Sequence, residues 1–127
     1  MLKGVLLVGI GGFIGSIARY VTTVFVHKIF PTNFPLGTLL VNLIGCFLIG
    51  IILGLFEKGE VLSPEMRLML SVGFCGGLTT FSTFTNDTIN LINDREVLFL
   101  TFYMGVSVFL GISLTLFGKT VVNYIWR

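Results

Sequence analysis

Long apolar runs separated by short polar breaks dominate this chain. Each run approaches the roughly 20 residues that an α-helix needs to cross the hydrocarbon core of a bilayer. We expect four membrane-spanning helices, over about residues 2–26, 36–56, 68–86 and 97–118. The breaks are short, so consecutive helices must be antiparallel neighbours in one domain of residues 1–127. A membrane β-barrel would need alternating segments of about ten residues, so the pattern favours an all-α integral membrane protein.

Composition agrees with a protein that sits in lipid. Of 127 residues, 54% are hydrophobic and 11% are charged, which leaves too little polar surface to coat a soluble domain. The net charge of +2 is small and scattered, so we expect no nucleic-acid partner. An alternative for the first run is a cleavable signal peptide, but its polar end at Arg19 favours a retained span.

Several classes of chemistry lack the residues they need. The predicted spans contain no Asp or Glu, and the single histidine, His27, falls in a loop, so a proton relay through the membrane is disfavoured. Cys46 and Cys75 lie far apart in apolar runs and fit no CxxC pair or metal knuckle. We therefore expect no enzyme, and we interpret both cysteines as packing residues.

Small residues recur four apart, as in Gly11 and Gly15 or Gly50 and Gly54, a spacing that lets helices approach closely. Packing within the bundle is one interpretation. Four helices are too few to enclose a pore, however, so we also expect a homodimer. Basic residues are divided five to three between the two sides of the membrane, a weak positive-inside bias that permits insertion in both orientations and an antiparallel dimer.

The third run carries the most distinctive pattern, with clustered glycines before a series of hydroxyls. Gly73, Gly76 and Gly77 each weaken a helix by about 1 kcal/mol relative to alanine, so we expect the third helix to break near mid-membrane. Freed carbonyl groups would then need protein, water or a cation. The alternative is a glycine-faced helix crossing whose hydroxyls bond back to the preceding turn.

Other polar positions in apolar runs are candidates for a pore wall. Thr38 and Asn42 are four apart, as are Tyr103 and Ser107, so each pair shares a helical face. Interhelical hydrogen bonding is the alternative for Thr38 and Asn42. Arg19 would either snorkel to the interface or place positive potential at the mouth of an anion pathway.

Aromatic residues follow the glycines. Phe81 and Phe84 are three apart and share a face, and the positive edges of two rings can favour a small dehydrated anion without a fixed charge. Simple packing is the alternative. The hydroxyls of Ser82 and Thr83 lie between the two rings in sequence and complete the set of pore candidates.

These motifs together closely resemble the bacterial fluoride channel family called Fluc or CrcB. The resemblance covers all four runs and rests on the motifs Gly11–Gly15 with Arg19-Tyr20, Gly37–Asn42, Gly73–Phe84, and Tyr103 with Ser107. It implies a dual-topology homodimer with two antiparallel pores at the subunit interface. We therefore expect a fluoride-selective channel in the bacterial inner membrane that exports cytoplasmic fluoride passively.

The resemblance also implies roles for single residues. Asn42, Phe81 and Phe84 would contact fluoride, and Na⁺ would bind at the dimer centre to backbone carbonyls of Gly76 and Thr79. Arg19 and Thr38 would then lie near a vestibule, with Tyr103 and Ser107 along a polar track.

One position departs from the family pattern, because Asp87 stands where a glutamate is common. Its shorter reach leaves the role of that carboxylate open. Two other classes remain: a small dual-topology secondary transporter, and a non-conducting membrane subunit whose glycines and hydroxyls only pack against a partner.

Overall fold

The computed structural model describes residues 1–59 and 61–127, and these residues form helices and short connections without a strand. Two long helices come first, α1 (Leu2–Ile29) and α2 (Leu36–Glu57). The third span is a series of shorter helices. Its members are α3 (Pro64–Leu68), the π-helical segment η1 (Met69–Cys75), α4 (Gly76–Leu78) and α5 (Phe81–Asn93). The last helix is α6 (Val97–Ile125).

Four stretches of the described chain are long and apolar enough to cross a membrane: α1, α2, the joined Pro64–Asn93 and α6. The predicted four-span architecture is therefore confirmed. The helices are longer than predicted, since α1 reaches Ile29 and α6 reaches Ile125. The interruption of the third span is also present, between α4 and α5.

The helix that contains the end of the third predicted span continues beyond residue 86, because α5 reaches Asn93. The extra turns are stabilised by packing, since Leu91 is 3% exposed and belongs to a core cluster with Leu39 and Tyr103. The helix ends where Arg95 takes a left-handed conformation with φ 58°. Asp87 thus lies within α5 rather than in the connection where the sequence places it.

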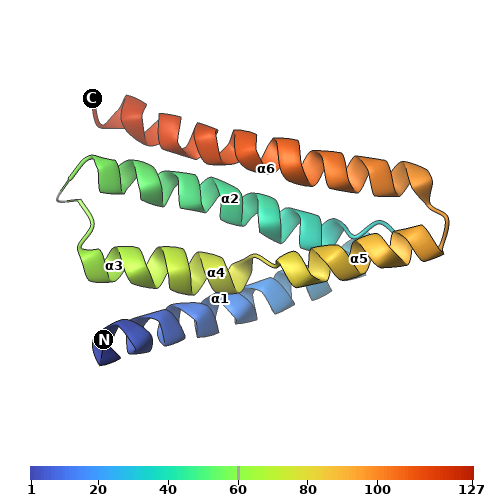
Figure 1. Cartoon of the computed structure of the whole chain (residues 1–127), viewed down its shortest axis with the longest axis horizontal. Helices are drawn as coiled ribbons and strands as arrows, with labels where there is room; N and C mark the ends of the chain where they lie inside the picture. Colours follow the sequence, from blue (N-terminus) through green and yellow to red (C-terminus); the bar gives the residue numbers. More distant parts are fainter. Residues whose placement is uncertain (60) are drawn as a thin grey trace.

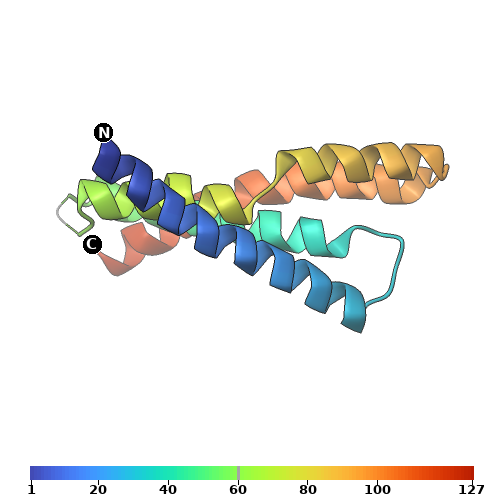
Figure 2. The ribbon, with the colours of Figure 1, turned by 90° about the horizontal axis from the view of Figure 1, so that it is seen from below.

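The helices pack side by side with both termini at the same end (Figure 1). In that view α2 lies between α6 and the interrupted third span, and α1 packs against η1 and α4. Figure 2 shows that α5 and α6 run together and diverge from α1 and the start of α2. The interruption therefore redirects the second half of the third span from α1 toward α6.

Glycines allow the closest helix approaches. A Cβ built on Gly77 of α4 would lie 2.6 Å from the Gly12 carbonyl oxygen of α1, and one on Gly15 would collide with the Phe74 carbonyl oxygen. A glycine also allows the close approach of α2 and α6, because a Cβ on Gly118 would lie 2.5 Å from the Phe47 carbonyl oxygen. Helix backbones can meet only because these positions carry no side chain.

We predict that Gly15→Ala destabilises the protein by about 1–3 kcal/mol, because its methyl group meets a backbone carbonyl that cannot move aside easily. The matched control is Gly9→Ala on the same helix, where no described atom outside the surrounding helix backbone and the adjacent residues lies within 4 Å of the new Cβ. That control should be neutral or slightly stabilising, since alanine favours the helix. Thermal unfolding in detergent compares the two; equal midpoints would contradict the packing role of Gly15.

Candidate functional site

The third span is interrupted at Thr79 and Thr80. Both residues are extended, with ψ 156° at Thr79 and φ −150°, ψ 119° at Thr80. Thr80 then caps the new helix α5, because its hydroxyl oxygen accepts a 3.1 Å hydrogen bond from the Thr83 N–H. A threonine in this role is a favourable N-cap.

The glycines expected to unwind the helix remain helical, with Gly73 in η1 and Gly76 and Gly77 in α4. The break was therefore predicted in the right region but assigned to the wrong residues. Gly73 and Gly77 are needed where α1 crosses, since a Cβ at Gly73 would lie 2.9 Å from the Val8 carbonyl oxygen. Their small size supports a close helix contact rather than an unwound turn.

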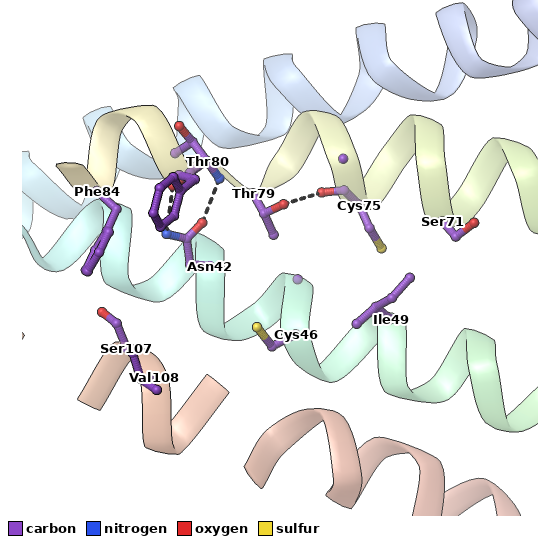
Figure 3. A pocket seen from close by; sticks show the side chains of 13 residues that line it. Asn42, Cys46, Ile49, Ser71, Cys75, Thr79, Thr80, Phe84, Ser107 and Val108 are labelled. Atoms are coloured by element: carbon purple, nitrogen blue, oxygen red, sulfur yellow. Dashed lines mark hydrogen bonds between the residues drawn. The ribbon is translucent and has the colours of Figure 1, made fainter. Parts of the chain in front are cut away.

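Asn42 of α2 supplies hydrogen-bonding partners for the interrupted backbone (Figure 3). Its Oδ1 accepts from the Thr80 N–H at 2.7 Å, and its Nδ2 donates to the Thr80 carbonyl oxygen at 3.1 Å. Arg19 of α1 donates through Nη1 to the Thr79 carbonyl oxygen at 3.2 Å. In hydrocarbon each unpaired backbone group costs several kcal/mol, so these two side chains stabilise the break.

One carbonyl loses its helical partner through this arrangement. In a continuous α-helix the Thr80 N–H would bond to the Gly76 carbonyl oxygen, but here it bonds to Asn42 instead. The Gly76 carbonyl oxygen therefore lacks the N–H donor that a continuous helix would give it. The Thr79 carbonyl oxygen uses one lone pair for its bond to Arg19 and keeps the second. Two carbonyl groups of this kind are hard oxygen donors of the type that alkali cations prefer.

A cavity of about 440 Å³ lies beside the break, between the third span, α2 and α6. It brings together six of the predicted site residues, which are Asn42, Gly76, Thr79, Phe81, Phe84 and Ser107. The Ser107 hydroxyl is buried without a hydrogen-bond partner, and Figure 3 shows this residue across the cavity from the break. The described residues that line the cavity carry no formal charge, so its polar surface consists of hydroxyl, amide and backbone groups beside aromatic rings.

The two phenylalanines line this cavity next to each other. The Phe81 and Phe84 ring centroids are 5.7 Å apart with an interplanar angle of 34°, so the predicted shared face is observed. Phe84 packs on Tyr103 with centroids 5.1 Å apart. Phe81 is 77% exposed on the single chain and therefore projects beyond it.

A second, smaller space of about 240 Å³ lies where α1 and α2 diverge from α5. This polar crevice is lined by the end of α1, the α1–α2 connection, the start of α2 with Thr38, and Asp87 of α5. Asp87 accepts a 3.0 Å hydrogen bond from the Tyr103 hydroxyl, and Tyr103 is fully buried. Tyr103 lines neither space but lies between residues that line each of them.

Ser82 and Thr83 do not line the cavity. The Thr80 hydroxyl lies 3.3 Å from the Ser82 hydroxyl and donates to the Thr83 hydroxyl at 3.0 Å, so both residues belong to the start of α5. Sequence reasoning missed the role of Thr80, although threonine is one of the residue types favoured at a helix N-cap. It also missed Phe34, which no periodic pattern marks.

Fold and site together define a class: a small four-span helical membrane protein with a cavity at an interrupted third span. Residues 6–119 match the family model described as CrcB-like protein, Camphor Resistance (CrcB), and the chain belongs to this family. The resemblance inferred from the motifs is thereby confirmed. The protein is a multi-pass protein of the bacterial membrane.

Similar proteins cover nearly the whole chain. A protein of Flavobacterium psychrophilum named fluoride-specific ion channel FluC is 40% identical over 122 residues, 96% of this chain and 98% of the relative. A protein of the same name from Chlorobaculum tepidum is 46% identical over 127 residues, 100% of this chain and 99% of the relative. A third, from Chlorobium phaeobacteroides, is 46% identical over 118 residues.

We predict that Asn42→Ala destabilises the protein by about 2–4 kcal/mol, because the Thr80 N–H and carbonyl oxygen both lose their partner in a buried site. The matched control is Asn90→Ala, at an exposed position of α5. The control should change stability by less than about 0.5 kcal/mol. Chemical unfolding in detergent measures both; a stable Asn42→Ala variant would mean that Asn42 does not support the break.

Proposed function

We propose that this protein is a fluoride-selective channel that lowers cytoplasmic fluoride by passive export. The main support for the proposal is that relatives named fluoride-specific ion channel match the chain over more than nine-tenths of its length. The same chain contains an uncharged cavity beside its interrupted third span. Passive conduction involves no chemical conversion, and the proposal therefore assigns no enzymatic activity.

The lining of the cavity suits a small anion. Fluoride is tightly hydrated, so a selective path must replace its water with donors and positive ring edges. Phe81 and Phe84 supply ring edges, Ser107 supplies a free hydroxyl, and Asn42 supplies an amide whose position is fixed by its bonds to Thr80. Since no cation lines the cavity, no fixed charge would trap the anion or favour larger ones.

The site is incomplete on one chain, and we propose that a second copy completes it as a homodimer. Phe81 borders the cavity and is nevertheless 77% exposed, so on a single chain its outer face would meet lipid rather than a pore wall. The weak bias of basic residues permits the antiparallel arrangement expected for the family. Two pores at the interface would then draw on both subunits.

We also propose that Na⁺ binds at the dimer centre. The Gly76 and Thr79 carbonyl groups fit this ion, because both oxygens have free lone pairs at the break. The described residues contain no group of three His, Cys, Asp or Glu that could hold a metal ion, which leaves carbonyl oxygens as the ligands. Two oxygens from each copy would supply a four-oxygen site, with Arg19 keeping the Thr79 carbonyl in place. Bound there, the ion would hold the two interrupted spans together.

One observation favours a secondary transporter as the second candidate. Asp87 lies in α5, within the third stretch that is long and apolar enough to cross a membrane, and an intramembrane carboxylate is a common component of ion-coupled transport. Its hydrogen bond to the fully buried Tyr103 instead suits a fixed structural role. The two candidates differ in kinetics, since a transporter gives slow, saturable and ion-coupled flux, whereas a channel gives fast, uncoupled flux.

The test is fluoride efflux from liposomes that contain the purified protein, with valinomycin and potassium to balance charge and a chloride electrode alongside. Rapid fluoride release without chloride release is expected. Release that depends on a proton or sodium gradient would support the transporter. No release from a well-folded protein would support a non-conducting subunit.

We predict that Phe81→Ile and Phe84→Ile each lower fluoride flux at least 100-fold while the protein remains assembled, because isoleucine fills similar space without a polar ring edge. The matched control is Phe25→Ile, a 61% exposed phenylalanine on α1 that lines neither space. It should conduct like the wild type. Unaltered flux in both pore variants would remove the phenylalanines from the mechanism.

Asn42→Asp tests the electrostatics of the same position. The substitution keeps an acceptor for the Thr80 N–H but replaces the donor to the Thr80 carbonyl oxygen by a carboxylate oxygen. A negative charge on an anion path should lower fluoride flux at least tenfold. Normal flux in the liposome assay would count against Asn42 as a pore residue.

A further inference from the structure

Phe34 lies in the connection between α1 and α2, immediately before Pro35, and its backbone is fixed on both sides. Its N–H donates to the Thr32 hydroxyl at 3.1 Å, and its carbonyl oxygen accepts from the Leu36 N–H at 2.8 Å. Pro35 restricts the chain further, with φ −77° at the N-cap of α2. The connection is therefore built to hold the Phe34 side chain in one direction.

That side chain packs into an aromatic cradle on α6, formed by Phe99, Phe102 and Tyr103. The ring centroids of Phe34 and Phe99 are 5.4 Å apart at 76°, and those of Phe34 and Tyr103 are 5.7 Å apart at 85°. The Phe102 ring lies at 5.7 Å and 56°. The first two contacts have the edge-to-face geometry that aromatic pairs prefer.

Tyr103 is thereby held from two sides. Phe34, which lines the polar crevice, packs on one side, and Phe84, which lines the cavity, packs on another at 5.1 Å. Tyr103 is fully buried, and its hydroxyl donates to Asp87 Oδ2. The ring of Tyr103 thus separates the two spaces, and its hydroxyl holds the carboxylate that lines the crevice.

We propose that Phe34 is a positioning residue for the ion path: by packing on Tyr103 it keeps the Tyr103 hydroxyl on Asp87. Without this contact Tyr103 turns away, and the Asp87 carboxylate faces the crevice without its donor. An unpartnered carboxylate at that point repels an approaching anion. The consequence for flux rests on the proposed fluoride conduction, whereas the contact with Tyr103 does not.

The first readout is independent of conduction. Tetranitromethane nitrates accessible tyrosines, and mass spectrometry locates the product on each peptide. Tyr20 and Tyr124 are 70% and 74% exposed on the chain and serve as internal references for the fully buried Tyr103. We expect Tyr103 to be protected in the wild type and in Phe25→Ala, and nitrated in Phe34→Ala. Continued protection of Tyr103 in Phe34→Ala overturns the proposal.

The second readout is fluoride efflux from liposomes. Phe34→Ala and Tyr103→Phe should each lower flux about tenfold, and Phe25→Ala should not. Because Phe34 acts through the Tyr103 hydroxyl, adding Phe34→Ala to Tyr103→Phe should cause no further loss. Losses that multiply to about 100-fold would mean that Phe34 acts independently of Tyr103 and would overturn the proposal.

Two further results keep the inference separate from the proposed function. If the wild type releases no fluoride, the proposed function fails, while the nitration result still decides whether Phe34 holds Tyr103. If Phe34→Ala does not assemble, Phe34→Leu keeps most of the apolar volume without a ring edge. Its Tyr103 should then be nitrated, and protection in that variant would overturn the inference.

Discussion

The structure depends on one constraint, that backbone groups freed by an interrupted helix in hydrocarbon must find partners inside the protein. Asn42 and Arg19 meet this constraint together. The Asn42 amide pairs with both the N–H and the carbonyl oxygen of Thr80, and Arg19 donates to the Thr79 carbonyl oxygen. The two Asn42 bonds fix where the third span stops and restarts. They also tie the interruption to α2, whose first turn lines the polar crevice.

The direction of α5 follows from this arrangement. Two extended residues, Thr79 and Thr80, separate α4 from α5, so the new helix need not follow the axis of the old one. The first half of the span stays against α1 through Gly73 and Gly77, and the second half runs with α6. The interruption thus produces both spaces, the cavity beside it and the crevice from which α5 diverges.

Sequence alone predicts the parts of this molecule that obey simple rules. The four spans follow from apolar length, and Asn42, Phe81, Phe84 and Ser107 stand out because polar or clustered aromatic residues in such spans need an explanation. All four line one cavity. Helical spacing shows only which residues share a face of one helix. That residues of α2, α5 and α6 line the same cavity becomes visible only in the structure.

Other features escape sequence rules because tertiary contacts decide them. Glycines lower helix propensity, yet Gly73 and Gly77 stay helical because the close approach of α1 requires them. Asp87 looks like the end of a span, yet the helix continues because Tyr103 supplies a donor and Leu91 packs in the core. Phe34 precedes a proline in a connection, where no periodic pattern applies, and its ring contacts come from α6, far along the chain.

Under the proposed function, the placement of formal charge explains how the site would bind an anion without retaining it. Arg19 directs its guanidinium to the Thr79 carbonyl oxygen, and Asp87 accepts from Tyr103, so each charged side chain near the path has a partner within the protein. The cavity itself offers only partial charges, from ring edges, a hydroxyl and an amide. Conduction requires binding that is favourable enough to replace water but weak enough to release the ion. Neutral groups held rigidly by the break and by aromatic packing meet both conditions, whereas an unpaired cation beside Phe81 would meet only the first.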